Sequence, residues 1–289
     1  MSIKSKVIWL AATVAVMLSC GGKETTTSSI STTEVEESWE EDSLQIQEEE
    51  EDKLELDLRE EDNLQLDSVF NDFLFAYLHS RSLRRERTAN PLLLEHPERP
   101  AELLEQFDAD FELSFLTGEY FTTLYGNASQ MLAEDYEEVE EDSVASLQRI
   151  NLNDSTIRNF LFQREEGRWK LTGIRESTIQ DDDLCNFLTF YAQFCTDSLF
   201  QMQSIADPLR VVIQDPEDEE GSINGIIDAD QWQTFCPEVP SGIISNIRKG
   251  QSYGQHKVVM RKSGLSNGLQ EVFTFTREKG IWRLTKYEN

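Results

Sequence analysis

Apolar residues recur at helical spacing in two separate segments of the chain. The first stripe consists of Val69, Phe70, Phe73, Leu74, Tyr77 and Leu78. The second stripe consists of Leu184, Phe187, Leu188, Tyr191 and Phe194. Residues three or four positions apart lie on the same face of a helix, so each set forms one wide apolar face. The spacing therefore predicts an amphipathic helix in each segment, with this face against a core.

Apolar and polar residues alternate in two later segments, as they do in half-buried strands. Phe160 and Phe162 share one side of a strand, and Trp169 and Leu171 share one side of the next strand, after the turn Glu165-Glu166-Gly167. Glycine permits the positive φ that such a turn needs. The same pattern returns at Phe273, Phe275, Gly280, Trp282 and Leu284. Each segment predicts an antiparallel hairpin whose tryptophan anchors a core; the alternative is an exposed aromatic that stacks on a ligand.

These helices and hairpins form an internal repeat. The pattern Phe70-x-x-Phe73-Leu74-x-x-Tyr77 returns 117 residues later from Phe187, and the hairpin pattern from Phe160 returns 113 residues later from Phe273. Two blocks that repeat in the same order indicate a tandem duplication. A period this long predicts two domains rather than a solenoid, whose repeats run about 20 to 50 residues. We place the first unit at residues 67–180 and the second at 181–289.

The start of the chain has the organisation of a signal peptide over residues 1–20. Lys4 and Lys6 precede an apolar run at residues 7–18, which is too short to span a bilayer. The stretch Met17-Leu18-Ser19-Cys20 resembles a bacterial lipobox, with Met where Leu is most common. The resemblance implies that Cys20 is lipidated and becomes the mature N-terminus. Each CH₂ group of an acyl chain that is buried in the bilayer adds about 0.8 kcal/mol to membrane binding, so the lipid would hold the protein at a membrane.

Charge distinguishes residues 21–66 from the rest. The 289-residue chain has a net charge of −29, and residues 21–66 contain 17 acids and 3 bases, which is about half of that excess. Such a stretch cannot bury enough apolar surface to fold, and its like charges repel one another. It predicts a disordered acidic tether. A surface this anionic is repelled by phosphate backbones, so nucleic acid is excluded as a partner.

A helix followed by antiparallel strands in each unit predicts an α+β fold. This order resembles the nuclear transport factor two-like (NTF2-like), or cystatin-like, fold, in which a curved antiparallel sheet cradles an N-terminal helical part. The lipobox, the tether and the paired units together resemble an uncharacterised family of Bacteroidetes lipoproteins. The resemblance implies two tandem cone-like units in the cell envelope, lipid-anchored in the outer membrane and facing the periplasm or the surface.

Two classes of function stay open, because this fold hosts binders and enzymes alike. The first is a non-catalytic module that binds an unknown small molecule or an envelope protein. The alternative is a small-molecule enzyme of isomerase or hydratase type with a cavity in one cone. In enzymes of this fold tyrosine and aspartate transfer protons, so the resemblance makes four tyrosines pocket candidates, although aromatics on an apolar stripe are usually core. These tyrosines are Tyr77, Tyr120, Tyr125 and Tyr191.

A basic cluster follows the first predicted helix in an otherwise acidic protein. It consists of Arg81, Arg84, Arg85 and Arg87, where the second unit has Ser198, Gln201, Met202 and Ser204. Guanidinium groups suit carboxylates and phosphates, so the cluster is a candidate site for an anionic group or a partner. The tether, lipopolysaccharide phosphates and a partner protein are the candidate occupants. The alternative is a solvated helix face.

Metal and cofactor sites are not expected. The histidines His79, His96 and His256 have no cysteine, histidine or carboxylate at metal-ligand spacing. Cys185 lies at the start of the second predicted helix and could form a disulfide with Cys236 in an oxidising compartment. Cys195 continues the apolar stripe and is expected to fill the core.

Overall fold

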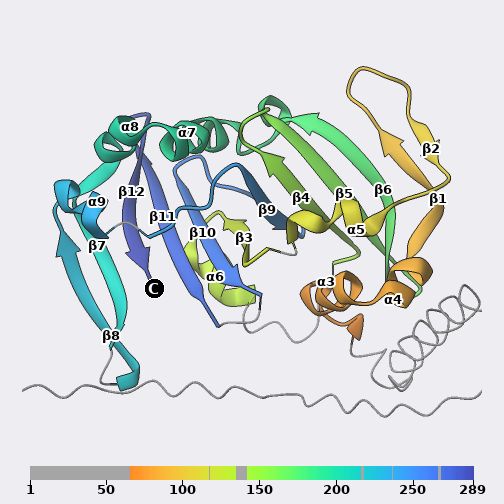
Figure 1. Cartoon of the computed structure of the whole chain (residues 1–289), viewed down its shortest axis with the longest axis horizontal. Helices are drawn as coiled ribbons and strands as arrows, with labels where there is room; N and C mark the ends of the chain where they lie inside the picture. Colours follow the sequence, from red (N-terminus) through yellow and green to blue (C-terminus); the bar gives the residue numbers. More distant parts are fainter. Residues whose placement is uncertain (1–65, 117, 135–141, 216–217, 236, 266–267) are drawn as a thin grey trace, which may run out of the picture. The chain divides into compact units, whose positions relative to one another are not determined.

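The computed structural model describes residues 66–289, apart from residues 117, 135–141, 216–217, 236 and 266–267 (Figure 1). The predicted signal peptide with Cys20, the predicted tether up to residue 65, and Cys236 lie outside the described residues. Residues from 66 onward belong to one compact unit.

The first half opens with two short helices. They are α3 (Phe70–His79) and α4 (Arg81–Glu86), and β1 (Thr88–Glu95), β2 (Glu102–Leu104), α5 (Ala109–Glu112), η1 (Ser114–Leu116), β3 (Tyr120–Tyr125) and α6 (Ala128–Glu134) follow. Three longer strands complete this half, β4 (Val144–Asn151), β5 (Thr156–Glu165) and β6 (Arg168–Thr178). Ser80 separates the helices, and its hydroxyl caps α4 by accepting the Leu83 amide at 3.1 Å. The predicted turn between β5 and β6 is confirmed, with positive φ at Glu166 and Gly167.

The second half repeats this order of elements. It contains η2 (Ile179–Asp181), α7 (Cys185–Thr196), α8 (Ser198–Gln203), β7 (Ile205–Asp215), β8 (Asp218–Ile227), η3 (Ala229–Gln231) and α9 (Trp232–Phe235). It ends with β9 (Ile243–Arg248), β10 (Lys257–Gly264), β11 (Gln270–Glu278) and β12 (Ile281–Glu288). In the part of the chain that the structure describes, no helix is long and apolar enough to cross a membrane.

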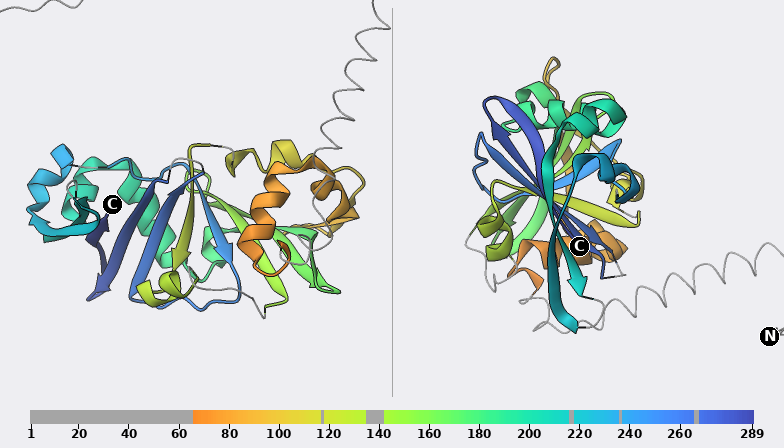
Figure 2. Two further views of the ribbon diagram at one scale, coloured as in Figure 1. Left: turned by 90° about the horizontal axis from the view of Figure 1, so that it is seen from below. Right: turned by 90° about the vertical axis from the view of Figure 1, so that its left-hand side faces the viewer.

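The strands of the described residues form two curved six-stranded sheets. The first sheet has the order β2-β1-β6-β5-β4-β9, and the second has the order β3-β10-β11-β12-β7-β8. Figure 2 shows the orange helices of the first half and the teal helices of the second half at opposite ends of the two sheets. Helices packed on mixed, mainly antiparallel sheets confirm the predicted α+β class.

Each sheet takes its last strand from the other half of the chain. β3 belongs to the first half but pairs with β10 of the second sheet, with Thr122 opposite Lys262. β9 belongs to the second half but pairs with β4 of the first sheet, with Ser245 opposite Arg149. The halves therefore exchange edge strands, as the subunits of a domain-swapped dimer do. The sequence boundary after residue 180 stays a prediction, since neither sheet is built from one side of it alone.

The exchanged strands meet through a reciprocal pair of polar residues. The Thr122 hydroxyl donates to the Ser245 carbonyl at 2.6 Å and accepts from the Ser245 amide at 3.0 Å. The Ser245 hydroxyl donates to the Thr122 carbonyl at 2.9 Å and accepts from the Thr122 amide at 2.8 Å. Both residues are buried. This self-complementary contact is the geometry expected at a local two-fold axis between the halves.

Each half has a core in which the predicted helix packs against the predicted hairpin. Phe70 of α3 lies 5.0 Å from Trp169, and Phe187 of α7 lies 5.4 Å from Trp282, both ring to ring and edge-on. Trp169 is 0% and Trp282 is 6% exposed, which confirms that the hairpin tryptophans are core residues.

A buried ion cluster also joins the halves. The Glu134 carboxylate at the end of α6 lies 3.1 Å from Lys249 Nζ and 3.3 Å from an Arg261 guanidinium nitrogen, with each side chain 10% exposed. Asn71 Nδ2 donates to the same carboxylate at 2.7 Å, and the Tyr125 hydroxyl donates to it as well. Burial alone would raise the pKa of Glu134, but the Lys249 charge and the hydrogen bonds outweigh burial and lower the pKa. The cluster connects α6 to β10 and to the segment after β9.

Candidate functional site

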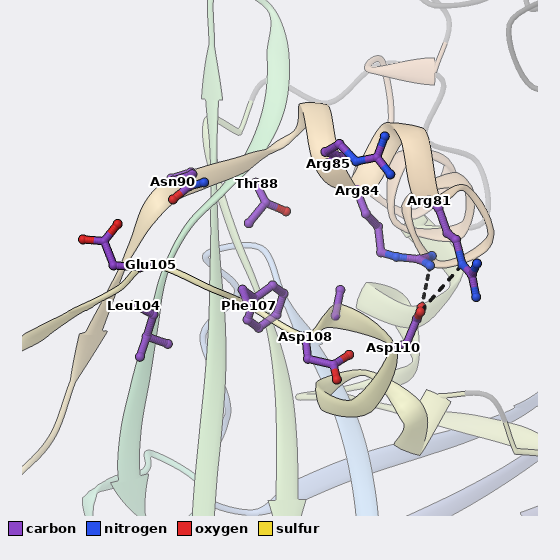
Figure 3. A pocket seen from close by; sticks show the side chains of 12 residues that line it. Arg81, Arg84, Arg85, Thr88, Asn90, Leu104, Glu105, Phe107, Asp108 and Asp110 are labelled. Atoms are coloured by element: carbon purple, nitrogen blue, oxygen red, sulfur yellow. Dashed lines mark hydrogen bonds and ion pairs between the residues drawn. The ribbon is translucent and has the colours of Figure 1, made fainter. Parts of the chain in front are cut away.

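A pocket of about 320 Å³ lies in the first half between α4 and α5 (Figure 3). One wall is α4, and the opposite wall is formed by the end of β2 and by residues 105–110, which lead into α5. Thr88, Ala89 and Asn90 at the start of β1 complete it. Three of the four arginines predicted as an anion site, Arg81, Arg84 and Arg85, line this pocket.

Arg84 fixes the two walls relative to one another. One of its guanidinium nitrogens donates to the backbone carbonyls of Tyr77 at 3.2 Å and Leu78 at 2.6 Å. The other donates to Asp110 Oδ1 at 2.6 Å, and the side chain is only 10% exposed. Arg81 approaches the same carboxylate at 3.7 Å but is 70% exposed. Asp110 therefore compensates both arginines, and Arg84 acts as a structural clamp.

Arg85 differs from its neighbours because its guanidinium has no partner among the described residues. It is exposed on α4 at the edge of the pocket (Figure 3). Two carboxylates lie on the opposite wall: Glu105, which is exposed, and Asp108, which caps α5 by accepting the Phe111 amide at 3.0 Å. The pocket therefore has a cationic wall and an acidic wall.

The floor of the pocket is apolar. Leu104, Phe107, Ala89 and Ala109 are partly buried there and pack against the core of the first half. Tyr77 lies in the core below, and its hydroxyl hydrogen-bonds to Thr88 Oγ1 at 2.6 Å. Burial raises the pKa of Tyr77 to about 12, so the phenol stays protonated. Tyr77 supports the pocket through Thr88.

Arg87 does not join the other three arginines, which corrects the grouping made from the sequence. Its guanidinium is buried and forms two hydrogen bonds to the Asp67 carboxylate, both at 3.1 Å. A further hydrogen bond reaches the Trp169 carbonyl at 3.2 Å. Asp67 also accepts the Trp169 amide at 2.8 Å. Arg87 therefore stabilises the base of the hairpin, and its charge is not presented to a ligand.

In the second half a buried tryptophan, Trp232, lies at the position that corresponds to this pocket. Gln201 replaces Arg84 and makes the equivalent contact, donating to the Phe194 carbonyl at 3.1 Å. Trp232, at the start of α9, donates its indole N–H to Gln201 Oε1 at 3.3 Å and is 0% exposed. Trp232 thus takes the place next to Gln201 that Asp110 takes next to Arg84.

The four candidate tyrosines do not converge on one cavity, which corrects that expectation. Tyr77 and Tyr191 are fully buried, in the first and the second core respectively. The Tyr191 hydroxyl donates to the Pro240 carbonyl at 2.7 Å, and burial raises its pKa well above the ordinary value. Tyr125 donates to Glu134, and Tyr120 lies under Lys262 Nζ at 4.6 Å from its ring centroid. Aromatic residues on these stripes fill the cones instead of lining a site.

A second pocket, of about 400 Å³, adjoins Tyr125, Glu134 and Lys249. Glu134 and Lys249 there already form the buried ion cluster described above. Their charges compensate one another, so this pocket is a weaker candidate than the one beside Arg85.

Cysteine and histidine supply no further site. Cys195 packs against the second core, and burial raises the pKa of its thiol to about 12. Cys185 has no disulfide partner among the described residues and Cys236 lies outside them, so their disulfide stays a prediction. His96 hydrogen-bonds to Glu102 at 3.0 Å and to Glu176 at 2.8 Å, and these bonds raise its pKa. Within the described residues no cluster of histidine, cysteine and carboxylate groups could hold a metal ion.

Phe107, Asp108 and Asp110 were not identified from the sequence. A signal was present, because aspartate is a preferred N-cap residue, and Asp108 is the N-cap of α5. That four-residue helix is too short to show apolar periodicity.

Comparison with known proteins supports the fold. A family model described as "Domain of unknown function (DUF4348)" matches residues 50–289. A crystal structure of an NTF2-like protein from Bacteroides fragilis is similar to this chain, with a TM-score of 0.66 and 26% sequence identity over 78% of this chain and 96% of that one. No curated protein matches. The likeness confirms the predicted NTF2-like fold.

Proposed function

The chain belongs to the family described as "Domain of unknown function (DUF4348)", and from that premise we propose that it is a non-catalytic, lipid-anchored envelope protein that binds a small molecule through an anionic group. The binding site is the pocket between α4 and α5, with Arg85 as the residue that contacts the anion.

The observation that carries this proposal is the Arg85 guanidinium, which has no partner among the described residues, at a pocket whose other arginines are compensated. Arg81 and Arg84 share Asp110, whereas Arg85 lines the same cavity without such a contact from the part of the chain that the structure describes. A guanidinium binds carboxylate or phosphate through two parallel hydrogen bonds. In a chain of net charge −29 the overall field repels anions, so a local cation beside a concave surface is the arrangement that anion binding requires.

The difference between the halves supports one site per chain. Both halves build the same scaffold around residue 84 or 201. The first half has the pocket beside Arg84, whereas in the second half the buried Trp232 contacts Gln201. The isomerase or hydratase alternative has less support. The hydroxyl of Tyr77, beneath the pocket, forms a hydrogen bond with the Thr88 hydroxyl. Burial raises the pKa of Tyr77 to about 12, which does not suit proton transfer near neutral pH.

Ligand-induced stabilisation tests the binding site. Thermal unfolding is followed with phenylacetate, phenyl phosphate and the neutral phenylacetamide, in the wild type, Arg85→Ala and Arg283→Ala. Arg283 is an exposed arginine of β12 and serves as the matched control. We expect at least one anion to raise the Tm of the wild type and of Arg283→Ala, with a smaller rise in Arg85→Ala and none with the amide. An equal response in Arg85→Ala would remove the pocket from the proposal.

The lipid anchor rests on the signal-like start of the chain and is tested separately. Labelled palmitate should enter the wild type but not Cys20→Ala, and only the wild type should sediment with membranes. Incorporation that persists in Cys20→Ala would show that the anchor is not at this residue.

A further inference from the structure

Two acidic residues place negative charge on the wall of the pocket that faces Arg85. Glu105 lies between β2 and α5, and its carboxylate has no partner among the described residues. Oδ1 of Asp108 accepts a hydrogen bond from the Phe111 amide at 3.0 Å. Oδ2 of Asp108 has no hydrogen-bond partner among the described residues. Figure 3 shows both on the opposite wall from Arg85, with Phe107 between the walls. The pocket thus has an open cationic contact and open anionic contacts, separated by an apolar floor.

The charges of the pocket residues balance one another, and a ligand with both signs leaves this balance unchanged. Its three arginines are matched by Glu105, Asp108 and Asp110. A simple anion would gain from Arg85 but would be repelled by Glu105 and Asp108. A ligand with an ammonium group and an anionic group would satisfy both walls without adding net charge.

From this arrangement, and resting on the proposed function, we infer that the ligand is a zwitterion of the amino-acid or short-peptide class. Its carboxylate pairs with Arg85, and its ammonium group lies at Glu105 and Asp108. An apolar side chain packs on Phe107 and Leu104, which are partly buried against the core. A volume of about 320 Å³ suits a ligand of dipeptide size.

The second half provides an internal contrast. Arg81, Arg84 and Arg85 correspond to Ser198, Gln201 and Met202, so the cationic wall is absent there. The buried Trp232 lies beside Gln201 in the same half. The first half therefore combines the arginines with a pocket, whereas the second half has uncharged side chains at the matching positions beside a buried tryptophan.

Titration calorimetry with three peptides tests each end of the ligand separately. The peptides are Ala-Phe, N-acetyl-Ala-Phe, which lacks the ammonium group, and Ala-Phe amide, which lacks the carboxylate. They are titrated into the mature chain and into Arg85→Ala, Glu105→Gln/Asp108→Asn and Glu98→Gln. Glu98 is an exposed residue of the loop before β2 that does not line the pocket, and it serves as the charge-matched control.

We expect Ala-Phe to bind at least tenfold more tightly than either blocked peptide. Glu105→Gln/Asp108→Asn should abolish the preference over the acetylated peptide, Arg85→Ala should abolish the preference over the amide, and Glu98→Gln should keep both. Equal binding of Ala-Phe and its acetylated form, still dependent on Arg85, would overturn the zwitterion inference and leave the proposed anion site intact. Equal binding of the acid and the amide would overturn both, as would binding of none of the three.

Discussion

Truncation of the hairpin tryptophans tests whether the exchanged strands make the two halves a single cooperative unit. Trp169 is 0% exposed and packs edge-on against Phe70, and Trp282 is 6% exposed and packs in the same way against Phe187. Substitution by alanine removes this contact between a helix and its hairpin. The two variants therefore perturb the two cores independently.

The expected loss is large for each variant. Replacing a buried tryptophan by alanine costs about 3 to 5 kcal/mol, because apolar contact is lost and a cavity is left. In a body of this size 1 kcal/mol lowers the Tm by about 2 to 4 °C, so each variant should lose about 6 to 20 °C. Since β3 pairs with β10 and β9 pairs with β4, melting of one half removes an edge strand from the other sheet. We therefore expect one transition in each variant.

Differential scanning calorimetry of both variants is the assay, with Phe75→Ala as control because Phe75 lies on the same helix as Phe70 but is 54% exposed. The control should melt within a degree or two of the wild type. Two separated transitions, with only the mutated half shifted, would refute the cooperative unit. A shift of less than about two degrees in both tryptophan variants would refute the core assignment itself.

Three further variants probe the junction and the filled half. Glu134→Gln removes the carboxylate charge that lies 3.1 Å from Lys249 Nζ and 3.3 Å from Arg261, and it should cost about 3 kcal/mol at pH 7. Because the folded pKa of Glu134 is lowered, its contribution is present above the unfolded pKa and is lost as the pH falls through the folded pKa, so urea midpoints of wild type and variant should converge in acid. Thr122→Val keeps the shape but breaks both bonds of the Thr122 hydroxyl to Ser245, and chemical denaturation should show a loss of about 1 to 3 kcal/mol; no loss would mean that the reciprocal contact is not stabilising. Trp232→Ala should lower the Tm but leave anion binding in the first half unchanged, and a change in affinity would couple the two halves.

The elements that carry a periodic pattern could be predicted from the sequence, because burial dictates that pattern. Phe73 and Phe190 occupy equivalent helix positions, and Trp169 and Trp282 occupy equivalent strand positions, as the repeat indicated. Strand exchange could not be predicted. A strand such as β3 has the same alternation whichever sheet it joins, and its pairing partner depends on chain connections that periodicity does not describe.

The candidate site was predictable only in part, because the sequence shows that a side chain is charged but not which group pairs with it in the folded protein. Arg85 and Arg87 are two residues apart, yet one is exposed at a pocket and the other is buried against Asp67, twenty residues earlier in the chain. Tyr77 and Tyr191 are not pocket residues for a related reason. An aromatic residue on an apolar stripe fills the core, as Tyr77 and Tyr191 do in both halves. The pocket lies outside that core, between α4 and α5, which are joined by the contact between Arg84 and Asp110.

The exchange of β3 and β9 also bears on how such a chain can evolve. In a symmetric homodimer each codon change appears at two equivalent places, so a cavity and its copy must be gained or lost together. Here the two copies are encoded separately. The second half has therefore acquired Trp232 beside Gln201, while the first half has retained Arg84 and Asp110 beside the pocket. Each half nevertheless supplies an edge strand to the other half's sheet, so deleting either gene segment would leave the surviving sheet one strand short. Selection can therefore change the two halves independently but has to retain both.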